Sequence, residues 1–202
     1  MIKVMATPIP LFNCPTRRNG GPYAPSNLGP YRSHDGVSDI AITLTAANQM
    51  ARTDYAACCG NTANDENGGG PTSLAAGDAG GWAGNPGFNG VIYQLSKVNI
   101  NQISRGTSNV IMVSEKRMNY ANYFTGQDPG DNDCMYVGMD NDMNRTTINL
   151  PARDLVADAG NDTLSFGSSH LSGVNVLFGD GTVRMVTYDI DLPTWQLMGQ
   201  IN

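Results

Sequence analysis

Apolar and polar residues alternate most clearly near the end of the chain, over residues 174–187. Apolar side chains occupy alternate positions of 174–178 and again of 183–185, and Asp180-Gly181, a favoured two-residue turn, lies between them. The pattern predicts a β-hairpin with one apolar face toward the core and this register: Phe178 opposite Val183, Leu177 opposite Arg184, and Val176 opposite Met185.

The C-terminal segment after this hairpin predicts a short helix. Asp191 can cap its N-terminus and Pro193 suits its first turn. Trp195 and Met198 share a face at helical spacing, and Gly199 can end the helix. The apolar face is therefore expected to pack on the core.

Earlier segments show shorter and less regular patterns. Residues 110–113 form a compact apolar strand, residues 39–52 fit a strand that leads into a short helix, and residues 91–103 contain two short β-type runs. Two polar excursions rich in turn-forming residues separate these elements: 61–90 and 128–144.

The composition favours many short elements over long helices. The 202 residues include 24 Gly and 11 Pro, whereas charged residues make up only 15%. Glycine and proline disfavour helix interiors and favour turns. We therefore predict a single α+β domain over residues 1–202 that is predominantly antiparallel β, with long Gly/Asn-rich loops, a Pro/Gly-rich lead-in at 1–38 and a hairpin segment at 165–191.

Charge and hydropathy exclude several classes of partner. The net charge of −6 leaves no basic surface to neutralise phosphates, so nucleic-acid binding is not expected. No run approaches the roughly 18 apolar residues of a membrane-spanning helix, so we expect no membrane span in this chain. The N-terminal segment also lacks the continuous apolar region of a signal peptide.

The cysteines favour disulfides over a zinc site. They are Cys14, Cys58, Cys59 and Cys134. The chain has no C-x-x-C motif and only two histidines, which disfavours a zinc site. Because adjacent cysteines rarely bridge each other, we predict that Cys14 and Cys134 each pair with one member of the adjacent pair. Buried free thiols in a reducing compartment are the alternative.

One loop concentrates side-chain oxygens of the kind that Ca²⁺ prefers. These residues are Asp128, Asp131, Asp133, Asp140, Asp142 and Asn144. The last three match the first ligand positions of an EF-hand loop, but Arg145 stands where glycine is needed and Pro151 where glutamate is needed. We therefore expect either a calcium loop of another type or a solvated acidic loop. A weaker second cluster consists of Asp158, Asn161 and Asp162.

The sequence does not indicate an enzyme. His170 and Asp180 lie too far apart along an extended strand to share a proton, so a structural role for His170 is expected, with Asp191 as its partner if the hairpin register extends that far. Ser168 and Ser169 precede this histidine, but no G-x-S-x-G motif is present. No phosphate-binding motif appears either. Catalytic and cofactor-binding residues are therefore predicted to be absent, with Ca²⁺ as the candidate metal.

Four ordered segments carry a family resemblance. His170, nine further residues and Asp180-Gly181 form an H-x9-DG pattern within FGSSHLSGVNVLFGDGTVRMVTYDID. The other segments are TPIPLFNCPTRR, ARTDYAACCGN and ISRGTSNVIMVSEK. Together they resemble the domain of unknown function 1559 family, a group of prepilin-like bacterial proteins abundant in planctomycetes. Members usually begin with a prepilin leader and a long hydrophobic helix, and the sequence above opens at the Pro-rich segment that follows them.

The resemblance implies a pilin- or pseudopilin-like globular head at the cell surface, in the periplasm or outside the cell. Its implied role is that of a non-catalytic subunit that self-associates or binds protein partners, with the Asn/Gly-rich excursions as contact surfaces. The residues themselves leave a second hypothesis open, a soluble binding protein for a sugar or small solute, stabilised by calcium. Aromatic side chains that could stack on such a ligand are Trp82, Tyr93, Tyr120 and Tyr123.

Overall fold

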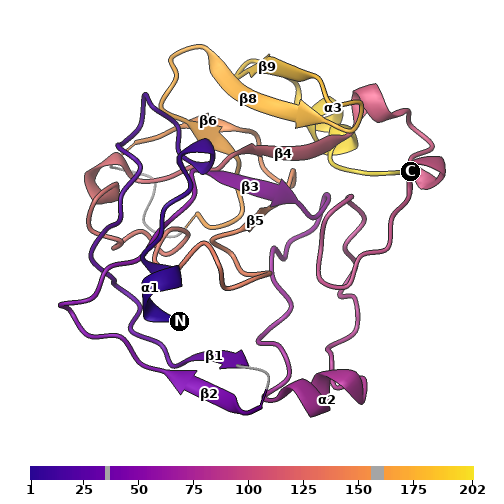
Figure 1. Cartoon of the computed structure of the whole chain (residues 1–202). Coiled ribbons are helices and arrows are strands. Elements are labelled where there is room, and N and C mark those ends of the chain that lie inside the picture. The colour runs from indigo at the N-terminus through magenta and orange to yellow at the C-terminus, as the bar shows by residue number, and fades with distance from the viewer. Residues whose placement is uncertain (35–36, 156–161) are drawn as a thin grey trace.

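A computed structural model describes residues 1–34, 37–155 and 162–202, and within them a five-stranded sheet forms the centre of the fold (Figure 1). Its order is β5-β3-β4-β8-β9, with every pairing antiparallel except that of β3 with β5. The strands are β3 (Tyr55–Cys58), β4 (Ile111–Glu115), β5 (Asn144–Arg145), β8 (Gly173–Phe178) and β9 (Val183–Thr187).

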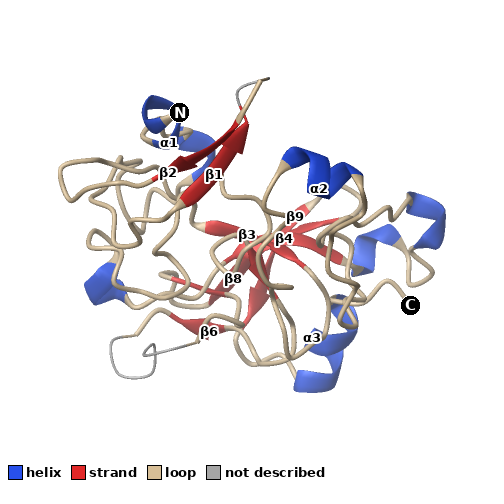
Figure 2. Cartoon of the chain, turned by 90° about the horizontal axis from the view of Figure 1, so that it is seen from below, coloured by secondary structure: helices blue, strands red, loops and turns tan. Residues whose placement is uncertain are grey.

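Two smaller sheets and short helices complete the described part of the chain. β1 (Tyr31–His34) pairs antiparallel with β2 (Asp39–Ile42), and β6 (Ala152–Arg153) pairs parallel with β7 (Gly167–Ser168). The α-helices are α1 (Ile2–Met5), α2 (Leu74–Asp78) and α3 (Leu192–Met198), and the 3₁₀ helices are η1 (Pro10–Phe12), η2 (Ile100–Gln102), η3 (Thr107–Asn109) and η4 (Tyr120–Asn122). Figure 2 shows these helices around the edges of the molecule, joined by long loops. The predicted α+β class with mostly antiparallel sheets is confirmed.

The predicted hairpin forms as β8 and β9, but its register differs by one residue. Leu177 pairs with Val183, and Val176 pairs with Arg184. The loop has three residues because the Gly181 amide donates to the Phe178 carbonyl (2.9 Å) and Gly181 adopts a left-handed φ of +82°. This is a type I turn closed by a glycine bulge, which adds one residue to the two-residue turn that the sequence predicted.

The shifted register changes which side chains of β9 face the core. Val174, Val176 and Phe178 are buried, as predicted for β8. In β9 the residues on that same face are Arg184 and Val186, whereas Val183 and Met185 lie on the opposite face and are 66% and 50% exposed. The prediction that Val183 and Met185 line the core is therefore wrong.

The main core lies between the sheet and α3. Trp195 of α3 is fully buried and packs edge to face on Phe166, with ring centroids 6.0 Å apart. The rest of this cluster comes from the sheet: Ala56, Cys58, Ile111, Val174, Val176 and Phe178. Asp191 caps α3 by accepting a hydrogen bond from the Thr194 amide (2.9 Å), and Gly199 follows its last turn, both as predicted.

The outer face of the sheet, opposite α3, is partly open. Ala57, Val113, Leu177 and Val183 pair in succession and form one apolar row across four strands. The first three are half-buried and Val183 is exposed. We call this row, together with Met185, the outer apolar row.

Two sequence predictions of secondary structure are wrong. Within residues 39–52 only Asp39–Ile42 form a strand (β2), and a turn at Thr45, closed by the Asn48 amide and the Thr45 carbonyl, follows in place of a helix. Residues 91–103 form turns and η2 in place of strands, with local backbone bonds from the Ser96 amide to the Tyr93 carbonyl and from the Ile103 amide to the Ile100 carbonyl. Val91 and Ile103 pack instead in a separate small cluster with Val110.

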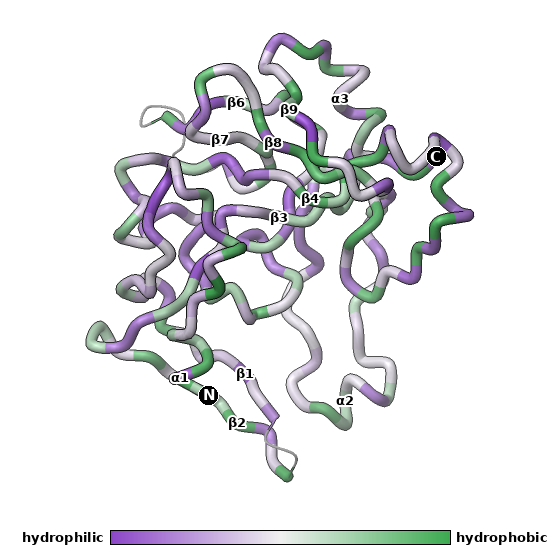
Figure 3. Tube along the Cα trace, turned by 45° about the horizontal axis from the view of Figure 1, so that its top comes forward, coloured by the Kyte–Doolittle hydropathy of each residue, from purple (hydrophilic) through white to green (hydrophobic). Residues whose placement is uncertain are grey.

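The predicted excursion at 61–90 extends away from the central sheet and carries α2. Figure 3 shows its two arms as largely pale, neither strongly hydrophobic nor strongly hydrophilic, which reflects their glycines. Among the described residues, none of the helices has the length and hydropathy that crossing a bilayer requires.

Candidate functional site

The four segments that carry the family resemblance meet at one end of the sheet. The Cys14 amide donates to Asp54 Oδ2 (2.6 Å), and the Lys116 amide donates to the Asp54 carbonyl (3.0 Å). The Arg17 guanidinium donates to the carbonyls of Lys116 (2.9 Å) and Gly167 (3.3 Å). Residues separated by up to 150 positions thus meet, and these polar contacts join the Pro-rich segment to the other three.

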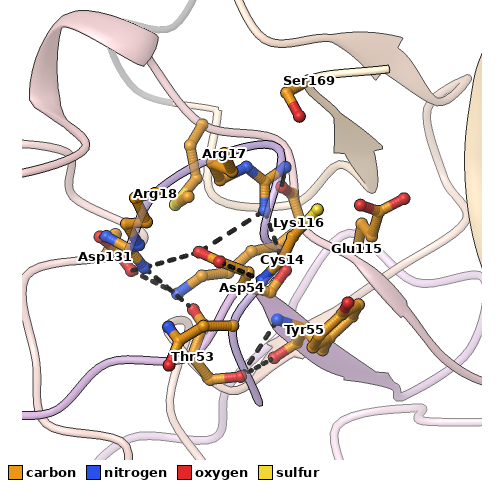
Figure 4. A network of polar contacts seen from close by, with 12 residues as sticks. Cys14, Arg17, Arg18, Thr53, Asp54, Tyr55, Glu115, Lys116, Asp131 and Ser169 are labelled. Carbon is orange, nitrogen blue, oxygen red and sulfur yellow. Dashed lines mark hydrogen bonds and ion pairs between the residues drawn. The ribbon is translucent and has the colours of Figure 1, made fainter. Parts of the chain in front are cut away.

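A buried network of ion pairs lies at this junction (Figure 4). Arg18 forms a two-pronged pair with Asp131 (2.5 and 2.9 Å) and also contacts Asp54 Oδ1 at 2.8 Å. Lys116 Nζ lies 2.9 Å from Asp131 Oδ1. Arg17 Nε donates to Asp154 Oδ2 at 2.9 Å. The side chains of these residues are at most 1% exposed.

The charges in this network balance. Arg17, Arg18 and Lys116 supply three cations, which match the carboxylates of Asp54, Asp131 and Asp154. Burial by itself raises the pKa of Asp131, but the charges of Arg18 and Lys116 outweigh burial and hold that pKa well below its usual range. The carboxylate is therefore ionised at neutral pH and acts as a fixed anchor.

A smaller cluster, formed by Cys14, Glu115 and His170, lies beside the network. His170 Nε2 lies 3.8 Å from Cys14 Sγ and 3.3 Å from Glu115 Oε1. Cys14 and Glu115 are buried, while the His170 side chain is 25% exposed. We call these three residues the Cys–Glu–His cluster.

His170 therefore has a different neighbour from the one predicted. Asp191 is occupied as the cap of α3, and Glu115 takes its place beside the imidazole. The predicted register fails here because β8 begins at Gly173, three residues after His170. The backbone of His170 is held by Ser168, whose Oγ accepts from the His170 amide (3.0 Å), and by Tyr188, whose hydroxyl donates to the His170 carbonyl (3.2 Å). Asp180 and Gly181 lie in the turn, but Gly179 joins them in a three-residue loop, which the prediction did not include.

The six residues of the predicted calcium loop separate into two groups. Asp131 belongs to the ion network, and Asp128 accepts backbone hydrogen bonds from Asn119 (2.6 Å) and Gly130 (3.0 Å). The Asn144 side chain donates to the Asp140 carbonyl (3.3 Å). These contacts leave one acidic group whose carboxylate oxygens lie within 4.8 Å of one another: Asp133, Asp140 and Asp142.

The weaker cluster is only partly within the described residues. Asp158 and Asn161 lie outside them, and Asp162 forms an ion pair with Arg117 at 2.8 Å.

The four cysteines are free thiols in the structure, and all are buried. The predicted disulfides are therefore wrong. Cys14 Sγ faces Thr16 Oγ1 (3.0 Å), Cys58 belongs to the main core, Cys59 Sγ faces the Arg145 carbonyl (3.2 Å), and Cys134 packs in a second core cluster near Met5. Their sulfur atoms contact different groups, and burial raises the pKa of Cys58 to about 12.

A groove of about 1020 Å³ lies near the acidic group. Trp82 and Tyr93 line it, as two of the four aromatic residues proposed for stacking, together with Tyr31, Asp133 and Asp140. The other two aromatics are elsewhere. Tyr123 is buried and donates to Asp154 Oδ2 (2.5 Å), and Tyr120 is exposed on η4.

Comparison with known proteins places the chain in a family. Residues 2–193 match the family described as "Protein of unknown function (DUF1559)". This match covers nearly the whole chain, so the chain belongs to the DUF1559 family. No curated protein and no solved structure matches it.

The ion network and the Cys–Glu–His cluster were not predicted from the sequence. The resemblance identified the four segments, but not which of their charged residues pair with one another. A usable signal was present, because Arg17-Arg18, Asp54 and Glu115-Lys116 all lie inside those segments. Only a small share of this chain is charged. Charged residues that lie inside the four segments carrying the resemblance therefore indicate buried ion pairs.

Proposed function

We propose that this chain is a non-catalytic structural or interaction subunit of a cell-surface, periplasmic or extracellular assembly, and that it associates with a second copy through the outer apolar row. The observation that carries the proposal is the exposure of Val183 (66%) and Met185 (50%) on a strand of the central sheet. An antiparallel sheet often has one face in water, but that face is usually polar, and contiguous exposed apolar side chains mark interaction sites.

The position of β9 supports association with a second copy. β9 is an edge strand among the described residues, so its outer side has backbone groups free for pairing. Natural edge strands usually carry charges that block such pairing. The one charged residue of β9, Arg184, lies on the other face, with its guanidinium 3.6 Å from the centre of the Phe178 ring. Two copies joined edge to edge at β9 would extend the outer apolar row.

The test is the dissociation constant of the self-associated chain, measured by sedimentation equilibrium. Because each buried apolar side chain contributes about 1.5–3 kcal/mol, replacing both Val183 and Met185 by glutamate is expected to weaken association at least tenfold. Ile100→Glu is the matched control, since Ile100 is 70% exposed on η2, away from the sheet. Equal association of the double variant and the wild type, or a monomeric wild type at all concentrations, would contradict the proposal.

The groove supports a second candidate function, the binding of a sugar or small solute. Aromatic rings beside amide and carboxylate groups are the common chemistry of sugar sites. Trp82, at 39% exposure, presents its ring to this groove, and Asn27 and Asn144 lie on its walls.

Calcium would fit the acidic group beside that groove. Asp142 is buried, and its Oδ2 has no hydrogen-bond partner among the described residues. Burial raises the pKa of Asp142 well above its usual value. A bound cation would neutralise the three carboxylates, Asp133, Asp140 and Asp142, and supply the missing partner.

A thermal unfolding series tests this second candidate. We expect millimolar CaCl₂ to raise the melting temperature by about 5 °C through preferential binding to the folded chain, and EDTA to reverse the rise. Asp142→Asn should abolish the rise, whereas Asp189→Asn, at an exposed position, should leave it unchanged. Addition of N-acetylglucosamine or glucose should then change the emission of Trp82 and not that of the buried Trp195. An unchanged melting temperature in CaCl₂ would contradict the proposed calcium site. Unchanged tryptophan emission would contradict binding of these sugars.

A further inference from the structure

Three electron-pair donors of different chemistry converge in the Cys–Glu–His cluster. They come from the loop before Arg17, from the end of β4 and from the segment before β8. One ligand atom from each of Cys14, Glu115 and His170 lies within 4.8 Å of the other two. We propose that these three residues bind a zinc-type divalent cation, with a fourth coordination position open to water or to a ligand from a partner.

The distances match a tetrahedral site. Zinc bonds are about 2.3 Å to cysteine sulfur, about 2.0–2.1 Å to histidine nitrogen and about 2.0–2.2 Å to carboxylate oxygen. At a tetrahedral angle these lengths put sulfur about 3.6 Å from nitrogen and nitrogen about 3.4 Å from oxygen. The corresponding separations here are 3.8 Å between Cys14 Sγ and His170 Nε2, and 3.3 Å between His170 Nε2 and Glu115 Oε1. A cation therefore fits with small side-chain adjustments.

One carboxylate oxygen of the cluster lacks a hydrogen bond, and a cation would supply the missing interaction. Glu115 is fully buried, and its Oε1 makes no hydrogen bond among the described residues. Its other oxygen, Oε2, accepts from the Asn175 amide at 2.9 Å. His170 Nε2 can carry at most one proton, yet it faces both the thiol and the carboxylate. A buried carboxylate oxygen that shares its neighbouring ring nitrogen with a thiol is poorly compensated, and a divalent cation would balance one thiolate and one carboxylate.

The same geometry argues against a nucleophile–base–acid triad. In a triad, the base contacts the nucleophile through one ring nitrogen and the acid through the other. Here Cys14 and Glu115 both approach Nε2. A thiol sulfur and a carboxylate oxygen that both approach the same ring nitrogen are arranged as the ligands of a metal ion are.

The surrounding structure holds each ligand in place. The Cys14 amide donates a hydrogen bond to Asp54 of the ion network, and the Glu115 carboxylate accepts one from the Asn175 amide of β8. Ser168 and Tyr188 fix the backbone of His170. Such supporting contacts orient metal ligands and strengthen binding. The partial exposure of His170 provides access for the metal and for a fourth ligand.

The experiment uses cobalt(II) as a spectroscopic probe for the zinc position. The full chain, stripped with chelator under reducing conditions, is titrated with CoCl₂ and then with ZnCl₂. We expect one equivalent of cobalt to produce the charge-transfer absorption of a cobalt–thiolate bond and the intense visible bands of a tetrahedral site, and zinc to displace it.

Matched variants distinguish this site from others in the chain. His170→Ala is expected to weaken cobalt binding at least 100-fold, and Cys14→Ser to abolish the thiolate absorption. His34→Ala replaces the other histidine, and Cys134→Ser another buried cysteine, and neither should change the spectrum. Circular dichroism of each variant confirms folding, and His170→Ala, at a partly exposed position, keeps the test valid if Cys14→Ser fails to fold. Absence of stoichiometric binding, a spectrum without the thiolate band, or loss of binding in His34→Ala would overturn the proposal.

Discussion

Replacing Arg18 by methionine is expected to lower the free energy of unfolding by about 3–5 kcal/mol, since removal of one partner leaves a buried opposite charge without compensation. Asp131 would lose its two-pronged partner, and Asp54 would lose a contact at 2.8 Å. Lys116 stays 2.9 Å from Asp131 and offsets part of the loss. A domain of this size has only about 5–15 kcal/mol of stability, so the variant should unfold at markedly lower urea concentration.

Three comparisons test this expectation in urea unfolding followed by circular dichroism. Arg153→Met is the control, because Arg153 is exposed on β6 and should change stability by less than about 0.5 kcal/mol. The double variant Arg18→Met with Asp131→Leu should recover part of the loss, since it removes one cation and one anion and leaves two buried cations against two buried carboxylates. Equal stability of Arg18→Met and the wild type would show that the pair contributes nothing to folding.

The same pair sets the direction of the pH dependence. The pKa of Asp131 is lower in the folded chain than the ordinary aspartate value of about 3.9 in the unfolded chain. The unfolded state therefore binds more protons at acid pH, and the stabilisation is present above about pH 4 and is lost as pH falls further. The stability difference between wild type and Arg18→Met should shrink over that acid range.

Replacing Trp195 by alanine is expected to cost about 3–5 kcal/mol, the usual range for a large aromatic residue removed from a core. Its indole is fully buried and connects α3 to the sheet through Phe166. Trp195→Phe should cost less, because a six-membered aromatic ring still fills part of the site and Nε1, which has no hydrogen-bond partner among the described residues, is removed.

The control for this substitution is Trp82→Ala, in the groove. Trp82 is 39% exposed, and its replacement should cost about 1 kcal/mol or less. Urea unfolding followed by far-ultraviolet circular dichroism measures both, since the emission of the two tryptophans changes with the substitutions themselves. If Trp195→Ala and Trp82→Ala were equally stable, α3 would not be a structural part of the core.

Local patterns predicted the elements that depend on neighbours in sequence. The alternation of 174–178 predicted β8, and the spacing of Asp191, Trp195 and Gly199 predicted α3 with its cap and its end. The turn between β8 and β9 could not be fixed in the same way. An Asp-Gly pair suits both a two-residue turn and a glycine bulge, and the choice between them moves β9 by one residue.

The candidate sites depend on contacts that no local pattern contains. Cys14 and His170 are 156 residues apart, and the ring and the sulfur meet only because β4 lies between β3 and β8. The family resemblance supplied the segments but not their arrangement. The acidic loop was identified by composition. Arg18 and Lys116 pair with Asp131, and backbone amides bind Asp128, so only Asp133, Asp140 and Asp142 form a group.

The buried ion network also bears on the order in which the chain folds. Its cations come from residues 17, 18 and 116 and its anions from residues 54, 131 and 154, so it closes only after distant parts of the chain have met. The β8–β9 hairpin closes over a three-residue loop and can form early at small entropic cost. Folding should therefore be slow for a chain of this length, with the long polar loops fixed last, when the charges lose their water together.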